Sequence, residues 1–202
     1  MTTLVIETAT AACSVALLDD DHVIARAHEI VGRGHAERLM PMIAELVAGR
    51  PTPTDVLVDC GPGSFTGVRV GLAAAKGLAL GWGAVAAGLS SLALIAAQVR
   101  GEGDIAVAIA GGHGELFLQR FAGDPLTPLD ALRSLAPEVA AMEVAEARVH
   151  GSGAAALVAA RGWGVAEELL PDAAEAWRLP EALRGLSPSP IYGRAPDARL
   201  PA

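Results

Sequence analysis

The order of strand-like and helix-like patterns in residues 3–100 constrains the fold of this chain more than any other feature. Three short apolar or alternating runs come first, separated by tight turns, and such a series predicts three antiparallel strands. Helix-type and strand-type patterns then alternate, which is typical of parallel βα units. We expect strands at 3–7, 14–18, 22–30, 55–60 and 84–88, and helices at 35–48, 65–81 and 90–100.

This β-β-β-α-β-α-β-α order is the layout of the ribonuclease-H-like domain of actin-type ATPases. The second half of the chain repeats its opening, which suggests an internal duplication. The repeat consists of a strand at 104–110, the turn GGHG, a strand at 115–121, helical patterns at 129–146, a strand, glycine turn and helix within 147–162, and a proline-rich tail that crosses back from about residue 186.

The expected fold class is therefore α/β, with two tandem ribonuclease-H-like subdomains of the actin (ASKHA) type. We place an N-terminal actin-like subdomain at residues 1–100 and a C-terminal one at 101–202. The second is expected to be smaller and degenerate. Actin-like proteins are built from two such halves, with nucleotide bound between them.

Composition excludes several classes of protein. Hydrophobic residues make up 52% of the chain and charged residues 19%, which suits a packed core and excludes a disordered chain. Fifteen Lys and Arg against 23 Asp and Glu give a net charge of −8, so unaided nucleic-acid binding is not expected. Cys13 and Cys60 have no metal-type spacing and are interpreted as buried thiols in a reducing cytoplasm. No signal peptide or membrane span is expected.

The glycine-rich stretch DCGPGSFTGVRVG at 59–71 lies between an expected strand and an expected helix. A Walker loop is excluded because no lysine lies inside it. A dinucleotide loop is disfavoured because the spacing is G-x-G-x-x-x-G and no acid follows until Glu102. Two interpretations stay open. The loop either binds an anion, or it is a packing turn in which Ser64 or Thr66 caps the helix.

Actin-type ATPases place an acidic residue in each of two hairpin turns to hold Mg²⁺ and orient water. The first turn offers Glu7, whereas the second, AGGHGE, has no acid before Glu115. The sequence therefore predicts the shell of a nucleotide fold without catalytic residues, metal or cofactor. His35, His113 and His150 are isolated and form no ligand pair. The candidates for a degenerate phosphate loop are Glu7, Thr8, Gly61, Gly63, Ser64 and Thr66.

Several segments together resemble one family, the TsaB (YeaZ) family, once called glycoprotease-like. The resemblance covers nearly all of residues 3–100 and weakens afterwards. It departs from the family at the second hairpin turn, AGGHG, and near the end, where Tyr192-Gly193-Arg194 replaces Tyr-Leu-Arg. The segments are IETAT with CSVALL, GHAERLMPMI, GPGSFTGVRVGLAAAKGLALG, GLSSLALIA and the terminal PIYGRAPDA.

The resemblance implies a non-catalytic, cytoplasmic subunit of the machinery that makes N6-threonylcarbamoyladenosine (t6A) in tRNA. In that family the catalytic paralogue is TsaD, the ATPase TsaE joins the pair, and TsaB alone forms homodimers. Transfer RNA would be bound only through the complex. The alternative is a stand-alone actin-fold ATP-binding enzyme, either an ATPase or an acyl kinase.

With this resemblance, the glycine loop is interpreted as an inherited phosphate-binding turn that now positions a helix at a dimer interface. Met40, Pro41 and Met42 on the neighbouring helix suit an adaptable interface. Small residues on one helix and an apolar stripe on the other define the expected surface. The partner-interface candidates are His35, Leu39, Met42, Ile43, Leu46, Gly67, Val68, Gly71, Leu72 and Ala75.

Overall fold

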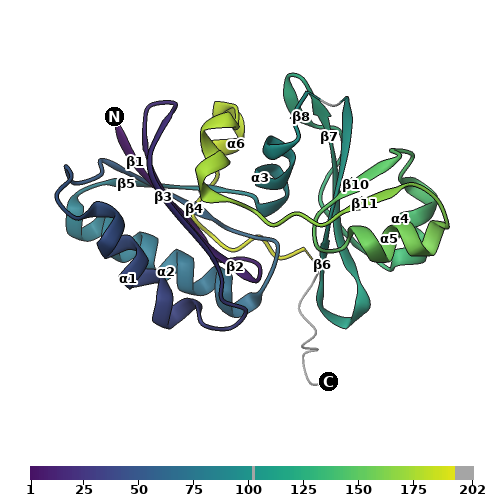
Figure 1. Cartoon of the computed structure of the whole chain (residues 1–202), viewed down its shortest axis with the longest axis horizontal. Coiled ribbons are helices and arrows are strands. Elements are labelled where there is room, and N and C mark those ends of the chain that lie inside the picture. The colour runs from purple at the N-terminus through teal and green to yellow at the C-terminus, as the bar shows by residue number, and fades with distance from the viewer. Residues whose placement is uncertain (102, 194–202) are drawn as a thin grey trace, which may run out of the picture.

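The computed structural model describes residues 1–101 and 103–193. It is an α/β protein with two mixed sheets that stand side by side, each with helices against it (Figure 1). The elements of the first half are β1 (Thr2–Glu7), β2 (Ala12–Asp19), β3 (His22–Ile30), α1 (His35–Val47), β4 (Asp55–Asp59), α2 (Phe65–Trp82), β5 (Val85–Leu89) and α3 (Ser91–Gln98).

The first sheet has the strand order β3-β2-β1-β4-β5. β1, β2 and β3 pair antiparallel, while β4 and β5 join them in parallel. This arrangement confirms the predicted meander followed by βα units, and the predicted ends of the elements differ from the observed ones by at most two residues. The agreement is close because turns interrupt the apolar runs of the strands. Two of these turns are at Asp20 and Gly83, where φ is positive.

The second sheet repeats the first, with the order β8-β7-β6-β10-β11 and the same pattern of antiparallel and parallel pairs. Its later strands are only three residues long, as expected for a smaller copy. The elements are β6 (Asp104–Ala110), η1 (Gly112–Gly114), β7 (Leu116–Gly123), β8 (Leu126–Pro128), β9 (Arg133–Leu135), α4 (Pro137–Glu143), β10 (Arg148–His150), α5 (Ala154–Arg161), β11 (Val165–Glu167), η2 (Ala173–Arg178) and α6 (Glu181–Arg184).

One part of the sequence prediction is wrong. Helical patterns were expected at 129–146, but β9 (Arg133–Leu135) in this range is a strand that pairs with β7, and α4 is confined to seven residues. The helix begins at Pro137 because proline fixes a helical φ and lacks an N–H that a first-turn residue would leave unpaired. The short run before it extends the sheet instead.

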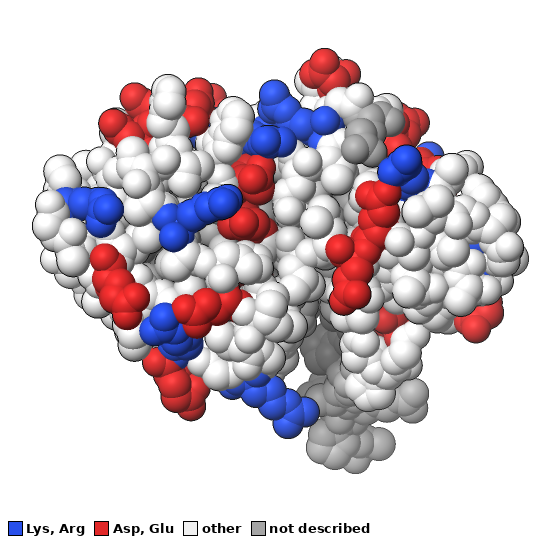
Figure 2. Space-filling view, viewed as in Figure 1, with Lys and Arg blue, Asp and Glu red and all other residues white. Residues whose placement is uncertain are grey.

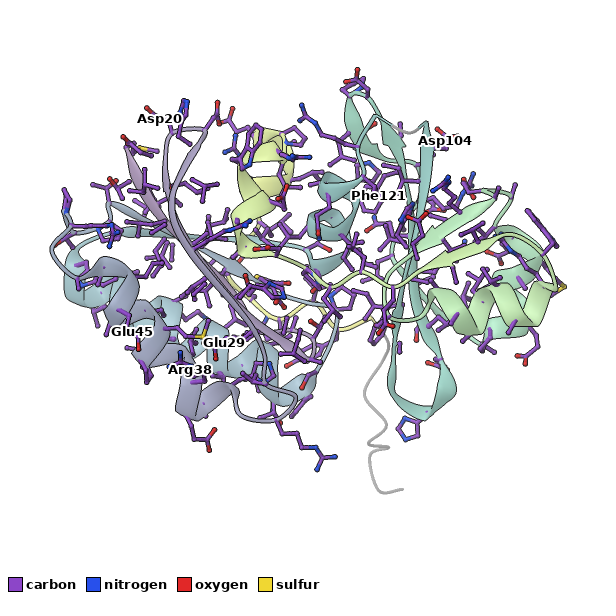
Figure 3. All side chains as sticks on the ribbon, viewed as in Figure 1. Asp20, Glu29, Arg38, Glu45, Asp104 and Phe121 are labelled. Atoms are coloured by element: carbon purple, nitrogen blue, oxygen red, sulfur yellow. The ribbon has the colours of Figure 1, made fainter. Side chains whose placement is uncertain are left out.

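Three apolar clusters define a layered molecule. α1 and α2 pack on the outer face of the first sheet, and α4 and α5 on the outer face of the second. The central layer contains α3 and η2, lies between the two sheets and contacts both. Phe121 of β7 is fully buried in this layer and is labelled in Figure 3. The two halves therefore share a core.

The end of the described chain returns to the first half. Gly88 of β5 exchanges two backbone hydrogen bonds with Leu186, at 2.7 and 3.0 Å, and the Ile191 N–H donates to the Cys60 carbonyl at 2.8 Å. We call residues 186–193 the strap. The expected crossing of the tail is thus present as far as Gly193, and residues 194–202 lie outside the described residues. The proposed boundary at residue 100 stays a prediction.

Candidate functional site

A cleft of about 1190 Å³ opens between the two halves. It lies where β1, β4, β6 and β10 end, which is the usual position of ligand crevices in α/β sheets. The first hairpin turn, the glycine loop, the second hairpin turn and the strap supply its walls. The lining residues include Ala9, Thr10, Gly63, Ser64, Phe65, Arg69, Gly111, His113, Ser152, Glu168 and Tyr192.

The glycine loop packs against the first hairpin turn without a gap. The Ser64 N–H donates to the Ala9 carbonyl at 2.6 Å, and a Cβ on Gly63 would collide with that same carbonyl. Gly61 has a φ of +97°, a backbone conformation that favours glycine. The loop therefore needs glycine for close contact between two turns of its own chain.

Ser64 begins α2 and caps it, because its hydroxyl accepts a hydrogen bond from the Gly67 N–H at 3.2 Å. Gly67 and Gly71 face the first hairpin turn, and a Cβ on either would collide with Thr8. The Thr8 hydroxyl in turn donates to the Gly67 carbonyl at 2.8 Å. These contacts support the packing interpretation of the loop over the anion-binding one.

Glu7 lies beneath the first hairpin turn, away from the cleft. Its side chain is fully buried, and its Oε1 accepts a hydrogen bond from the Ala9 N–H at 2.6 Å. Burial raises the pKa of Glu7 well above its usual value, and the neighbouring Asp59 carboxyl adds to that shift. Glu7 therefore holds the turn and does not line the cleft.

Of the six phosphate-loop candidates, Gly63 and Ser64 line the cleft. Glu7, Thr8 and Gly61 are buried behind it, and Thr66 is exposed on α2. The structure therefore brings all six to one corner but presents only two of them to a ligand.

The second hairpin turn forms the opposite wall. The Gly111 N–H donates to the Glu115 carbonyl at 2.7 Å, and His113 has a φ of +61°. Ser152 stabilises this wall, because its hydroxyl accepts a hydrogen bond from the Ala110 N–H at 3.1 Å. Among the described lining residues, the charged side chains are Arg69 and Glu168, so neither hairpin turn contributes a carboxylate to the cleft.

An aromatic and arginine cluster borders the cleft. The Arg69 guanidinium lies 3.3 Å from the centre of the Phe65 ring and donates to the Tyr192 hydroxyl at 3.1 Å. Both rings are more than half exposed. Sequence reasoning missed this group, although the i, i+4 spacing of Phe65 and Arg69 on a helix was a usable signal.

Comparisons with known proteins identify the family. A family model described as "TsaD: tRNA N6-adenosine threonylcarbamoyltransferase" matches residues 25–168. The Escherichia coli protein named tRNA threonylcarbamoyladenosine biosynthesis protein TsaB is 38% identical over 131 residues, which cover 61% of this chain and 56% of that protein. The Bacillus subtilis protein of the same name is 38% identical over 104 residues, covering 50% and 45%.

A solved structure, YeaZ from Pseudomonas aeruginosa, agrees with a TM-score of 0.80 at 28% identity and covers 95% of this chain and 99% of that one. The chain belongs to the TsaB (YeaZ) family. Its matched stretches span about half the length of the two curated TsaB relatives.

The buried positions of the interface candidates do not support the interface expected from the TsaB resemblance. The structure places all ten inside the chain, between the first sheet and helices α1 and α2. His35, for example, is 5% exposed, and its Nε2 lies 2.9 Å from the Ala12 carbonyl oxygen. Apolar periodicity identified the buried faces correctly but could not tell a core from an interface. Any interface on these helices must use their opposite faces.

Within the part of the chain that the structure describes, no group of three or more His, Cys, Asp or Glu side chains is placed to hold a metal ion. Among the helices of residues 1–101 and 103–193, none is both long and apolar enough to cross a membrane.

Proposed function

We propose that this chain is a non-catalytic, cytoplasmic subunit of the machinery that forms t6A in tRNA. The relatives from Escherichia coli and Bacillus subtilis are named tRNA threonylcarbamoyladenosine biosynthesis protein TsaB, and this supports the pathway. The observation that carries the non-catalytic role is the cleft. Its described hairpin turns offer no carboxylate, and the acid of the first turn is buried in a structural contact.

The alternative, a stand-alone ATPase or acyl kinase, is disfavoured by the same geometry. Phosphoryl transfer depends on charged groups and metal ions positioned around the phosphates. In the described cleft, the Arg69 guanidinium stacks on Phe65 and donates a hydrogen bond to Tyr192. This guanidinium is therefore already engaged at the edge of the cleft. Glu168 alone does not make a metal site.

The proposed partners are a TsaD-type transferase and a TsaE-type ATPase, with a homodimer when the chain is alone. We place the interface on the exposed face of α1 and α2, which pack against each other. Met40 is 46% exposed and Leu80 87% exposed, and a Cβ on Gly77 or Gly81 would meet no atom within 4 Å. A second helix could therefore approach this face closely.

Transfer RNA would be held through the complex. The net charge of −8 opposes binding to a phosphate backbone. Figure 2 shows Lys and Arg interspersed with Asp and Glu over the face in view, which has no continuous basic surface there. A partner subunit must then supply most of the positive charge.

Leu80→Arg tests the interface. The substitution adds a charge to an exposed position, so the isolated chain should stay folded, and its melting temperature should fall only by the stability that the homodimer adds. A charge buried in an interface without a partner is costly, and affinity for a purified TsaD-type partner should fall at least about tenfold. Calorimetric titration would measure the affinity. Met142→Arg is the matched control, because Met142 is 79% exposed on α4 in the other half.

Equal affinity of Leu80→Arg, Met142→Arg and the unchanged chain would place the interface elsewhere. Failure of the unchanged chain to bind any TsaD-type partner, together with hydrolysis of Mg-ATP by the purified chain, would overturn the proposed function itself.

A further inference from the structure

Two acidic side chains lie next to each other on the central face of the first sheet. Ile6 of β1 pairs in parallel with Val58 of β4, so the next residues, Glu7 and Asp59, are also neighbours. Adjacent strands are about 4.8 Å apart. Val5 and Leu57, two residues earlier on each strand, belong to the central core, so alternation points both acids toward the same layer.

Each acid uses one oxygen and leaves the other without a partner. Glu7 Oε1 accepts from the Ala9 N–H at 2.6 Å, and Asp59 Oδ1 accepts from the Gly61 N–H at 2.7 Å. Asp59 Oδ1 also accepts from the Ser91 hydroxyl of α3 at 2.8 Å. Glu7 Oε2 and Asp59 Oδ2 are buried and have no hydrogen-bond partner among the described residues.

The surrounding groups only partly offset the two charges, because the Thr10 N–H lowers the pKa of Glu7 and the Ser91 N–H lowers that of Asp59, but burial outweighs both. Asp172, just before η2, is a third acid, and its charge disfavours ionised Glu7. Its Oδ1 accepts from the Ser14 hydroxyl at 3.1 Å, and its Oδ2 lies 3.7 Å from His28 Nδ1 of β3. On the covering elements, α3 contributes the Ser91 hydroxyl, while η2 carries Glu175 and Arg178, which pair with each other at 2.8 Å.

Burial of two adjacent carboxylates without a cation is costly, and one proton between them removes both the repulsion and the unpaired oxygens. We propose that Glu7 and Asp59 share one proton and that this shared proton fixes the two turns forming one wall of the cleft. Glu7 holds the first hairpin turn through Ala9, and Asp59 holds the glycine loop through Gly61.

The pair thereby couples protonation to the cleft wall and to α2. The Ser64 N–H to Ala9 carbonyl bond joins the two turns, and Thr8 holds α2 through the Gly67 carbonyl. When the shared proton leaves, two negative charges on neighbouring strands push the turns apart. This coupling between protonation and the cleft wall is a property of the isolated chain and does not depend on the proposed function.

The direction of the pH effect follows from the folded-state pKa values. Burial raises the pKa of Asp59 to about 7, and that of Glu7 is raised well above its usual value. Both acids have their ordinary, lower pKa in the unfolded chain, so the folded state binds more protons between these values. Stability contributed by the pair is complete at low pH and is lost as pH rises through the folded-state pKa.

Thermal melting between about pH 5.5 and 8.5 tests this. For the unchanged chain we expect the melting temperature to fall by about 5–10 °C across the range. Asp59→Asn and Glu7→Gln each supply an amide N–H in place of the shared proton, so their melting temperatures should change by less than half as much. Asp55→Asn, at the far end of β4, is the control and should follow the unchanged chain.

A second measurement keeps the test decisive if a variant fails to fold. Carbon-13 NMR of the carboxyl groups in the unchanged chain should show two coupled titrations, with one step near neutral pH or above. Parallel melting curves for all variants, or two acids that titrate normally near pH 4, would overturn the shared proton. So would Mg²⁺ that restores stability at high pH in the unchanged chain alone, because the pair would then hold a cation.

Discussion

At the scale of single residues, the glycines of α2 fall into two classes with different tasks. Gly67 and Gly71 lie against Thr8, where a Cβ would collide with the first hairpin turn. Gly77 and Gly81 face open space on the outer side of the same helix. The first pair serves the fold of the chain itself. The second pair lowers the stability of the helix, although a Cβ at either position would meet no atom within 4 Å. Such open positions suit a surface that a partner approaches.

Gly71→Ala and Gly77→Ala separate these two tasks. Gly71→Ala should lower the free energy of unfolding by about 1–3 kcal/mol, because the added methyl overpacks the contact with Thr8. Gly77→Ala should raise it by about 0.5–1 kcal/mol, because alanine is the better helix former where space is free. Urea unfolding measures both. Equal effects of the two substitutions would contradict the assignment of the faces.

At the scale of elements, the strap and the central layer join the halves. α3 and η2 pack between the sheets, and residues 186–193 cross from the second half to β5 and the glycine loop. On the other side of the first sheet, Arg38 of α1 forms two hydrogen bonds, at 2.6 and 2.7 Å, with Glu29 of β3, both labelled in Figure 3. The first sheet is therefore fixed on one face by elements distant in sequence and on the other by α1, which directly follows β3.

Gly88→Val tests the strap. The new side chain would meet the Ser187 carbonyl oxygen at 2.9 Å from its Cβ and crowd Cys60, so the strap must move. We expect a loss of about 1–3 kcal/mol in stability and faster hydrogen exchange at the Leu186 and Ile191 amides. Val85→Ala, at the exposed start of β5, should leave both unchanged. Unaltered exchange at both amides in Gly88→Val would show that the strap does not depend on this contact.

The elements also show what sequence patterns can and cannot predict. The strands and helices of residues 3–100 follow from local patterns, since long periodic runs and glycine turns mark them clearly. The strand β9 and the short η2 and α6 were not predicted, because their few residues gain their structure from contacts with β7, β2 and β5. The proximity of Glu7 and Asp59 was not predicted either, because only the register between β1 and β4 brings these two residues together.

At the scale of the whole molecule, two copies of one topology enclose a cleft that lacks acids from either hairpin turn among its described lining residues. The protein has the two-sheet α/β architecture of the YeaZ structure to which it is similar. Its first acid holds a turn instead of a metal, and its glycines pack the chain instead of cradling phosphate. This arrangement supports the proposal that the chain binds and positions a catalytic partner.

The central claim is that the chain is required for t6A formation but performs no step of the chemistry. Reconstitution with a purified TsaD-type transferase, a TsaE-type ATPase, tRNA and the threonylcarbamoyl donor, with t6A quantified by mass spectrometry, tests this most directly. We predict that t6A forms only when the chain is added, and that Asp59→Asn and Glu7→Gln variants that fold support it at pH 7 as well as the unchanged chain does. Formation of t6A without the chain, or Mg-ATP hydrolysis by the chain alone that Glu7→Gln abolishes, would contradict the account.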